Sequence, residues 1–369
     1  MISTAPEVDA LIAANAPVVV CVSGGKDSRR APIESVAYAR SQGHTGQIVL
    51  CYSDLGRVVW SDAKEQCQML ADRLGVELVI VRRAAGGLME RWQKRWTDNV
   101  ERYVNLSCVK VILPWSTPAM RFCTSELKTT IIQRWIRKTF NEPVVCVLGI
   151  RRDESRHRAK APIFKPYEVT IKDGKEKMPA LPVGSVDWNP IVEVKTETVF
   201  QILRASEMPI PSSYTFGADR YSCAFCMMAT VNNLAAGTRD PRNHDLYREQ
   251  CELEIVSTFS FQDSQWLSDV APELLTEDQR QRLPLSKEAG QLREQIESVI
   301  PKHLLYVKGW PVVMPTMAEA QMLADIRKRT GEIMGLPVKY TTALDVWNRY
   351  DELMRLNEER QSKKRKKVA

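Results

Sequence analysis

The sequence predicts an α/β fold, in which a doubly wound, mostly parallel sheet is followed by a mostly helical C-terminal region. Three observations lead to this prediction. Short apolar runs rich in β-branched residues recur through the first 150 residues, segments with helical spacing separate them, and helical spacing continues through the last third of the chain. Strands joined by segments too long for a hairpin pair in parallel and are covered by helices on both faces.

Strands and helices alternate in the first 150 residues. The predicted strands are the apolar runs at residues 17–22, 47–52, 77–81 and 143–148. A first helix continues to about Gln42, and Pro32 near its start predicts an irregular first turn. A second helix has Ser61 as its N-cap and Gly75 as its stop signal, and two more are expected near residues 86–101 and 125–140.

Beyond residue 150 the pattern weakens and then becomes helical. Residues 160–190 are rich in Lys, Pro and Gly without a clear period, which predicts a loop or a small hairpin. A helix is predicted at residues 196–207, and the chain from about residue 245 is expected to be mostly helical. The clearest helix carries apolar residues three and four apart that indicate a core-facing stripe, namely Ala343, Val346, Trp347, Tyr350, Leu353 and Met354.

The composition is that of a folded protein with a charged end. With 44% apolar and 26% charged residues the 369-residue chain can bury a core, and its length suggests two domains. It has no run of about 18 apolar residues and no signal-peptide pattern, so we expect a cytoplasmic protein without membrane contact. Most of the net charge of +7 comes from a terminal run that predicts a solvated tail or, alternatively, a nucleic-acid contact, namely Lys363, Lys364, Arg365, Lys366 and Lys367.

The first predicted strand ends in a glycine turn suited to phosphate, Ser23-Gly24-Gly25-Lys26-Asp27-Ser28. In an open α/β sheet, ligands bind where strands end and helices begin, because helix N-termini offer unpaired N–H groups there. The glycines permit close approach, the hydroxyls can donate to phosphate oxygens, and the lysine adds positive charge. A bland structural turn is the alternative. It is not a Walker A loop, since Val20 replaces the first glycine and an aspartate follows the lysine. The next residues, Arg29 and Arg30, either bind phosphate or face solvent.

The turn resembles the signature loop of the PP-loop ATP pyrophosphatase superfamily, whose adenine nucleotide alpha hydrolase-like (HUP-like) fold is shared with phosphoadenosine phosphosulfate (PAPS) reductases. Two further segments resemble loops of these families, Tyr52-Ser53-Asp54-Leu55-Gly56 and Leu148-Gly149-Ile150-Arg151-Arg152-Asp153-Glu154-Ser155 with Arg158. The resemblance covers about residues 17–230. It implies a nucleotide-binding domain over residues 1–230 that includes a CxxC segment, a helical region over residues 231–360 and a basic tail over residues 361–369.

The resemblance implies ATP and Mg²⁺ as cofactors and assigns roles to residues. The implied catalytic residues are Lys26, Asp27, Arg151 and Glu154. The implied nucleotide-binding residues are Ser23, Gly24, Gly25, Lys26, Asp27, Ser28, Asp54, Gly149, Arg151 and Arg158. We expect Asp54, Arg151 and Glu154 to converge on one crevice, because each follows a predicted strand. The alternative for Arg151, Glu154 and Arg158 is a surface ion-pair cluster.

Three cysteines are candidate metal ligands, namely Cys123 and the CxxC pair Cys223 and Cys226. A CxxC can chelate a metal, hold a cluster or form a redox pair. The combination resembles cluster-binding members of the superfamily, such as the sulfur-transfer component of DNA phosphorothioation systems, which implies an iron–sulfur cluster. Zinc with His244 and unligated thiols are the alternatives. A fourth ligand is Cys251, Cys108 or an external sulfide or substrate, or it is absent. The remaining cysteines are interpreted as core residues, namely Cys21, Cys51, Cys67 and Cys146.

The function implied is ATP cleavage to AMP and pyrophosphate that adenylates an acceptor. Sulfur transfer to a nucleic acid or a small molecule would follow, with a sulfur donor protein as a partner. A PAPS or adenylylsulfate reductase is the first alternative, although the intact glycine turn and the lack of an E-C-G-L-H type motif near the C-terminus disfavour it. A non-catalytic nucleotide-binding or iron–sulfur accessory protein is the second.

Overall fold

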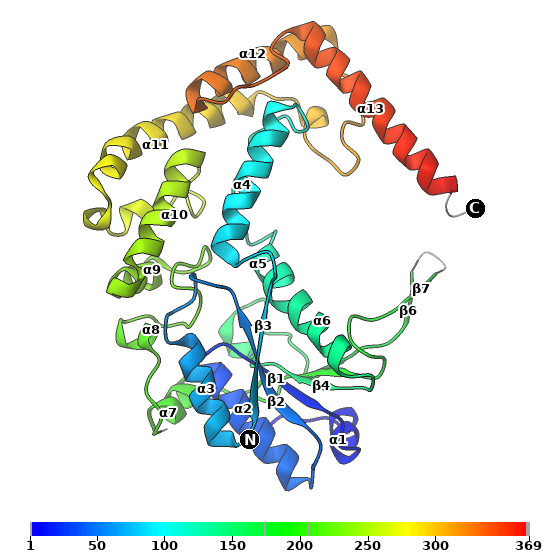
Figure 1. The fold of residues 1–369 in the computed structure, drawn as a ribbon, viewed down its shortest axis with the longest axis vertical. Coiled ribbons are helices and arrows are strands. Elements are labelled where there is room, and N and C mark those ends of the chain that lie inside the picture. The colour runs from blue at the N-terminus through cyan, green and yellow to red at the C-terminus, as the bar shows by residue number, and fades with distance from the viewer. Residues whose placement is uncertain (1, 173–174, 206, 367–369) are drawn as a thin grey trace. The chain divides into compact units, whose positions relative to one another are not determined.

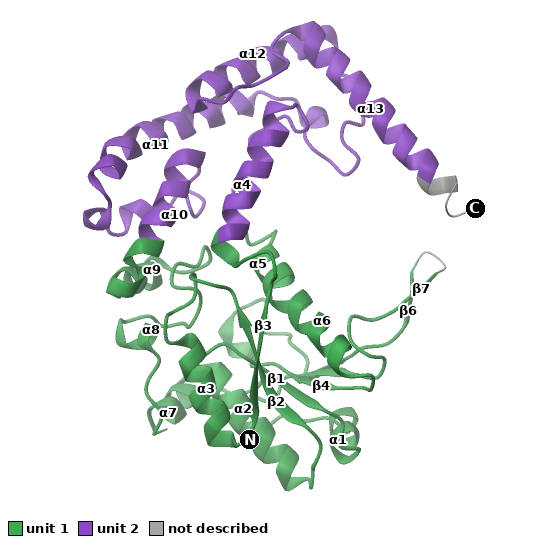
Figure 2. Cartoon of the chain, in the orientation of Figure 1, with its two compact units in different colours: residues 1–89, 116–246 green, residues 90–115, 247–369 purple. Residues whose placement is uncertain are grey.

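The computed structural model describes residues 2–172, 175–205 and 207–366, and it divides into two compact units. Unit 1 comprises residues 1–89 and 116–246, and unit 2 comprises residues 90–115 and 247–369 (Figure 2). Residues 90–115, which the sequence-based division left in the first domain, therefore group with the C-terminal helices. Tyr103 and Cys108 pack there against Met334 and Val338, which explains the grouping.

Unit 1 is built on a six-stranded sheet in the order β3-β2-β1-β4-β8-β5. Figure 1 labels four of its strands, β1 to β4. Its strands are β1 (Val18–Val22), β2 (Ile48–Asp54), β3 (Glu77–Arg82), β4 (Val145–Val147), β5 (Phe164–Pro166) and β8 (Val186–Trp188). All neighbouring pairs are parallel except β5 with β8. The predicted mostly parallel α/β sheet is confirmed. β8 and β5 extend the sheet and come from residues 160–190, which were predicted as a loop or a small hairpin. The prediction missed them because three-residue strands are too short to show a period.

Helices cover both faces of this sheet, which makes it doubly wound. Alternate residues of β1 point to opposite faces, with Val18 and Val20 in one apolar cluster and Val19 in another. The first cluster contains residues of α1 (Pro6–Ala13), α2 (Lys26–Ser41) and α3 (Ala63–Leu74), and the second contains Ile136 of α6 (Thr130–Thr139). The other helices of unit 1 are α5 (Phe122–Thr124), a π-helical turn (Ser125–Thr129), α7 (Thr196–Ala205), α8 (Ser212–Thr215) and α9 (Val231–Thr238).

Two of three predictions about helices α2 and α3 need correction. Pro32 lies inside a continuous α2 rather than at an irregular start. The N-cap of α3 is Asp62, not Ser61, and its carboxylate accepts hydrogen bonds from the backbone and hydroxyl of Ser212. Gly75 ends α3 at φ +60°, as predicted.

Arg29 and Arg30 neither face solvent nor line the site described below. Both are buried, and Arg29 donates to Gln66 Oε1 at 2.6 Å and to the Pro209 carbonyl at 2.7 Å. Arg30 pairs with Glu34 at 2.9 Å. The first arginine therefore ties α2 to α3 and to the chain after α7.

Unit 2 is helical, as predicted. It contains most of α4 (Leu88–Val104) and α10 (His244–Ser257), with α11 (Glu277–Ser298), α12 (Met317–Met334) and α13 (Ala343–Lys366). Val346 and Tyr350 of the predicted stripe are fully buried in its core. The tail is helical through Lys366, and Lys367 lies outside the described residues. No helix among the described residues has the length and apolar character needed to cross a membrane.

Short elements complete the chain. β6 (Thr170–Lys172) and β7 (Lys175–Lys177) form a separate two-stranded sheet in unit 1. Single 3₁₀ turns are found at Arg152–Glu154, Pro241–Asn243, Leu267–Asp269, Pro272–Leu274 and Lys302–Leu304.

Candidate functional site

A cavity of about 520 Å³ opens where β1, β2 and β4 end in unit 1. Its size is in the range of small-molecule and cofactor sites. One end is polar and is formed by the glycine turn and the loop after β4, with Ser23, Gly25, Lys26, Asp27, Ser28, Gly149, Glu154 and Arg158. The other end has apolar walls with a few polar groups, among them Ile132, Gln133, Leu148, Tyr167, Leu181 and Asp187.

The glycine turn is closely packed from both sides. Gly24 has φ +87°, which favours glycine, and α2 begins two residues later. A Cβ atom on Gly25 would lie 2.5 Å from the Cβ atom of Tyr221, so only glycine fits there without a shift. The Ser23 N–H donates to the Ser28 hydroxyl at 2.5 Å and closes the turn on itself.

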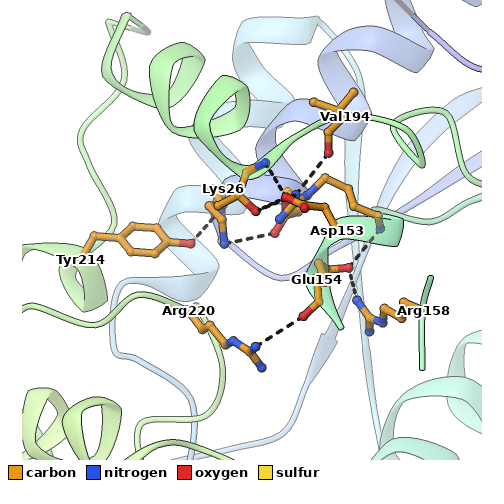
Figure 3. A network of polar contacts seen from close by, with 10 residues as sticks. Lys26, Asp153, Glu154, Arg158, Val194, Tyr214 and Arg220 are labelled. Atoms are coloured by element: carbon orange, nitrogen blue, oxygen red, sulfur yellow. Dashed lines mark hydrogen bonds and ion pairs between the residues drawn. The ribbon is translucent and has the colours of Figure 1, made fainter. Parts of the chain in front are cut away.

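Lys26 is buried against aromatic rings at the polar end of the cavity. Its ammonium lies 5.1 Å from the ring centre of Phe200 and 5.8 Å from that of Tyr214. Its backbone N–H donates to the Tyr214 hydroxyl at 3.1 Å (Figure 3). Burial raises the pKa of Tyr214, so this phenol is neutral at neutral pH. Phe200 of α7 and Tyr214 of α8 thus contact the Lys26 side chain, and Tyr214 also accepts from the Lys26 N–H, the first of α2.

Asp27 is held by a buried arginine that follows β4. Arg151 Nε donates to Asp27 Oδ1 at 2.5 Å, and the Lys26 ammonium lies 3.3 Å from Asp27 Oδ2. Arg151 is 1% exposed and also donates to the Val194 carbonyl and the Thr196 hydroxyl. Because Arg151 is buried, the alternative of a surface ion pair is excluded for it. Its guanidinium lies behind Asp27 rather than on the cavity wall.

Glu154 and Arg158 form an ion pair on the cavity wall (Figure 3). Glu154 Oε2 also accepts from the Arg151 N–H at 3.0 Å, and the Glu154 carbonyl accepts from Arg220 at 3.4 Å. A Cβ atom on Gly149 would lie 3.1 Å from the Asp27 carbonyl oxygen, so this glycine lets the loop after β4 approach the glycine turn.

Asp54 is separated from these residues. Its carboxylate accepts from the Gly56 N–H at 2.8 Å and lies 3.9 Å from Arg82. It lines a second pocket that shares only Tyr52 and Val59 with the first cavity. The structure thus brings Asp27 and Glu154 to the cavity, places Arg151 directly behind it and leaves Asp54 on the neighbouring pocket.

The apolar end contains a polar group of residues that the sequence did not reveal. Tyr167 donates to Asp187 Oδ2 at 3.0 Å, and Gln133 lies 3.4 Å from the Tyr167 hydroxyl. Burial raises the pKa of Asp187. These residues come from α6, β8 and the loop before β6, and no motif links them, so only the fold could bring them together.

The three candidate metal ligands are neighbours in unit 1. Burial raises the pKa of Cys223 to about 12, with smaller contributions from the Cys226 and Cys123 thiols. Burial also raises the pKa of Cys226, and the positive charges of Lys128 and Arg121 offset part of this increase in the pKa. Within the described ranges, no three His, Cys, Asp or Glu side chains are placed to hold one metal ion. The thiols are soft donors of the type that iron and zinc prefer, but in this arrangement they do not converge on one ion.

The other proposed ligands occupy structural positions. His244 Nε2 lies 2.9 Å from the Thr238 carbonyl oxygen. Cys108 and Cys251 are buried in unit 2, and burial raises the pKa of each thiol. Cys51, Cys67 and Cys146 are core residues as predicted, whereas Cys21 is partly exposed and its sulfur lies 3.9 Å from that of Cys146.

Comparison with known proteins supports a family for unit 1. Residues 61–229 match the model of the phosphoadenosine phosphosulfate reductase domain. The match begins after the glycine turn and includes Arg151, Glu154 and all three candidate cysteine ligands. No curated protein matches the chain.

Proposed function

Because residues 61–229 belong to the phosphoadenosine phosphosulfate reductase domain family, which acts on nucleotides, we propose that this protein binds ATP and cleaves it to AMP and pyrophosphate. The cleavage would adenylate an acceptor for sulfur transfer. The observation that carries the proposal is the position of the turn Ser23–Ser28 on the wall of the 520 Å³ cavity. A nest of backbone N–H groups at a helix N-terminus is suited to the two terminal phosphates of ATP.

The two ends of the cavity match the two ends of a nucleotide. Phosphates would lie at the polar end, against Lys26 and Arg158, which both line it. The adenine would lie between the apolar side chains of Ile132, Leu148 and Leu181, and Gln133 or Asp187 could bond its edge. The base would thus meet a mostly apolar surface with a small number of placed polar groups.

The proposed reaction has two displacements. An acceptor oxygen attacks the α-phosphorus of ATP, the bond from that phosphorus to the bridging oxygen breaks, and pyrophosphate leaves with the bond electrons. A sulfur nucleophile from a donor protein then attacks the activated acceptor, and AMP leaves. The protein's part is positioning and charge stabilisation. Lys26 and Arg158 offset the negative charge that develops on pyrophosphate, and Arg151 holds Asp27 in one orientation.

Mg²⁺ would enter with the nucleotide. It is usually held by one or two carboxylates together with substrate phosphates, so a site with Asp27 alone on the protein side fits its chemistry. The Asp27 side chain is 17% exposed and lines the cavity. When bound, the ion would neutralise phosphate charge. An iron–sulfur cluster or zinc at Cys123, Cys223 and Cys226 is a separate prediction, and no step of the reaction is derived from it.

Nucleotide binding and turnover test the proposal together. We expect isothermal titration calorimetry to show binding of α,β-methylene ATP, which resists cleavage between those phosphates. Lys26→Ala should weaken this binding by at least tenfold, whereas Lys138→Ala, which removes an exposed lysine of α6, should leave it unchanged. ATP labelled at the α-phosphate should give AMP when a suitable acceptor is present. Release of sulfite from PAPS, with no binding of the ATP analogue, would instead establish the reductase alternative.

A further inference from the structure

Three polar side chains form a hydrogen-bonded chain at the apolar end of the cavity. Gln133 Nε2 donates to the Tyr167 hydroxyl at 3.4 Å, and this hydroxyl donates to Asp187 Oδ2 at 3.0 Å. All three residues line the cavity. Burial raises the pKa of Tyr167, so the phenol keeps its proton at neutral pH and can act as a donor. A few polar groups placed in a mostly apolar pocket decide which ligand it takes and in which orientation.

The direction of this chain follows from the group at its end. A phenol has a single hydrogen, and a carboxylate is a stronger acceptor than an amide oxygen. The Tyr167 hydrogen therefore points to Asp187, and Gln133 must turn its amide nitrogen, rather than its oxygen, toward the phenol. An amide nitrogen carries two hydrogens, so Gln133 can give the second one to a ligand.

Tyr167 occupies one of the two carboxylate oxygens of Asp187. Oδ2 takes the phenol hydrogen, which makes Oδ1 the oxygen that can accept from a ligand. Burial raises the pKa of Asp187, and Tyr167, Lys165 on the neighbouring β5 and the thiol of Cys146 on β4 lower it in part. A thiol is a weak donor, so an amino group of a ligand can displace it from the carboxylate.

The two common purine bases make different demands on this pair of side chains. Adenine has its N6 amino group beside the N1 acceptor, so the amino group suits Asp187 Oδ1 and N1 suits the second N–H of Gln133. Guanine has two adjacent donors, N1–H and N2–H, which match a carboxylate that offers both oxygens. With Oδ2 occupied, one of these donors is left without an acceptor, and in an apolar pocket its loss of solvation is not recovered.

We propose that Tyr167 is a positioning residue that selects adenine over guanine by occupying Asp187 Oδ2. The selection rests on the proposed function, because it requires the base to lie at the apolar end of the cavity. It depends on the phenol rather than on the carboxylate alone, since Asp187 with both oxygens available would suit guanine. Removal of the phenol hydroxyl should therefore change which base is bound.

Isothermal titration calorimetry with α,β-methylene ATP and α,β-methylene GTP tests this selection. The titrations are made at pH 8, where a carboxyl group with a raised pKa is ionised to a larger extent than at pH 7. We expect the wild-type protein to bind the ATP analogue roughly tenfold or more tightly than the GTP analogue. In Tyr167→Phe this ratio should fall by about fivefold or more, because Oδ2 becomes available and the GTP analogue binds more tightly than it does to wild type.

Asp187→Asn provides a second measurement with a side chain of the same shape. Its oxygen would take the Tyr167 hydrogen, so its NH₂ group would face the amino group of adenine, donor against donor. We expect the ATP analogue to bind this variant roughly tenfold more weakly than wild type. The control Tyr306→Phe removes an exposed phenol hydroxyl of unit 2 and should leave both affinities unchanged.

A purely structural role of Tyr167 would give a different pattern. Equal weakening of both analogues in Tyr167→Phe, with their ratio unchanged, would overturn the selection and leave nucleotide binding in place. Equal affinities of the wild type for the two analogues, or tighter binding of the GTP analogue, would also overturn it. A wild type that binds neither analogue would refute the proposed function, and the selection with it.

Discussion

Arg151 and Asp27 meet at 2.5 Å although 124 residues separate them in sequence. The arginine is 1% exposed, and its Nη1 donates to the Val194 carbonyl, the Thr196 hydroxyl and, at 3.4 Å, to Asp153 Oδ2. The contact joins the loop after β4 to the turn after β1, which are the two loops that form the polar end of the cavity. Disruption of this pair is therefore expected to affect both stability and ligand binding.

The first prediction concerns that pair. Arg151→Met should lower the free energy of unfolding by about 3 kcal/mol, because it removes the buried guanidinium that donates to Asp27 Oδ1 and leaves the partly buried carboxylate with only the Lys26 ammonium beside it. Adding Asp27→Asn should recover about 1 to 3 kcal/mol, a coupling expected of residues in direct contact. Urea unfolding of both single variants and the double variant measures this. Strictly additive losses would show that the two side chains act independently.

The second prediction concerns the close approach at the glycine turn. Gly25→Val should weaken binding of α,β-methylene ATP at least tenfold, because its Cβ atom would collide with Tyr221 and its branches would fill the phosphate path. Tyr221→Gly in the same background removes the Cβ atom with which the valine collides and should restore binding only in part. Circular dichroism confirms the fold of each variant. Full affinity in Gly25→Val would remove the turn from nucleotide binding.

The third prediction concerns the cysteines. Single serine variants at Cys123, Cys223 and Cys226 should lose bound iron or zinc to a similar extent, because a site with three protein thiolates is weakened by removal of any one. Cys67→Ser is the control, since Cys67 is buried in an apolar cluster. Elemental analysis after anaerobic purification decides the matter. Full metal content in all three variants, or none in the wild type, would refute a shared metal site.

The fourth prediction concerns a buried carboxyl group in unit 2. Burial raises the pKa of Glu254 to about 7, although three backbone N–H groups, of Phe261, Leu267 and Ser268, donate to it and lower the pKa in part. A carboxyl whose pKa is raised on folding stabilises the folded state most below its unfolded pKa, and this contribution is lost as pH rises through the folded value. The free energy of unfolding should therefore fall by about 2 to 3 kcal/mol between pH 5 and pH 8.

Glu254→Gln provides the comparison for that pH dependence. Glutamine does not titrate, so the variant should show a much flatter pH profile in urea unfolding. A wild type whose stability is constant or rises over pH 5 to 8 would contradict the prediction.

The sequence predicted those features that a local pattern encodes. Strands β1 to β4 are apolar runs between helical segments, and the glycine turn is a continuous motif, so both could be located from their own residues. β8 could not, because its three residues Val186, Asp187 and Trp188 show no period and join the sheet only through pairing with β4. The position of Asp54 was predicted from the end of its strand alone, and that argument failed. Its side chain turns toward Gly56 and Arg82 and does not line the cavity.

The roles of the arginines depended on tertiary structure. Arg29 and Arg30 follow the glycine turn at the start of α2, where an arginine could reach a phosphate, yet Arg29 is used to bind backbone carbonyls of residues 208 and 209. Nothing in the sequence near Arg29 indicates those partners, which are 179 and 180 residues away. The burial of Arg151 was equally hidden, because its acceptors Asp27, Val194 and Thr196 lie 124, 43 and 45 residues away in the sequence.

Because the Lys26 N–H already donates to the Tyr214 hydroxyl, a ligand binds this N–H only if its oxygen is a stronger hydrogen-bond acceptor than the phenol. A ligand oxygen that takes this donor must displace a neutral phenol, so binding there is an exchange of acceptors rather than the gain of one. A neutral oxygen of similar strength gains nothing by the exchange. A charged oxygen forms a hydrogen bond roughly twice as strong, so it displaces the Tyr214 hydroxyl from the Lys26 N–H. Nucleosides and sugars would therefore be rejected at the same position where a polyphosphate is accepted.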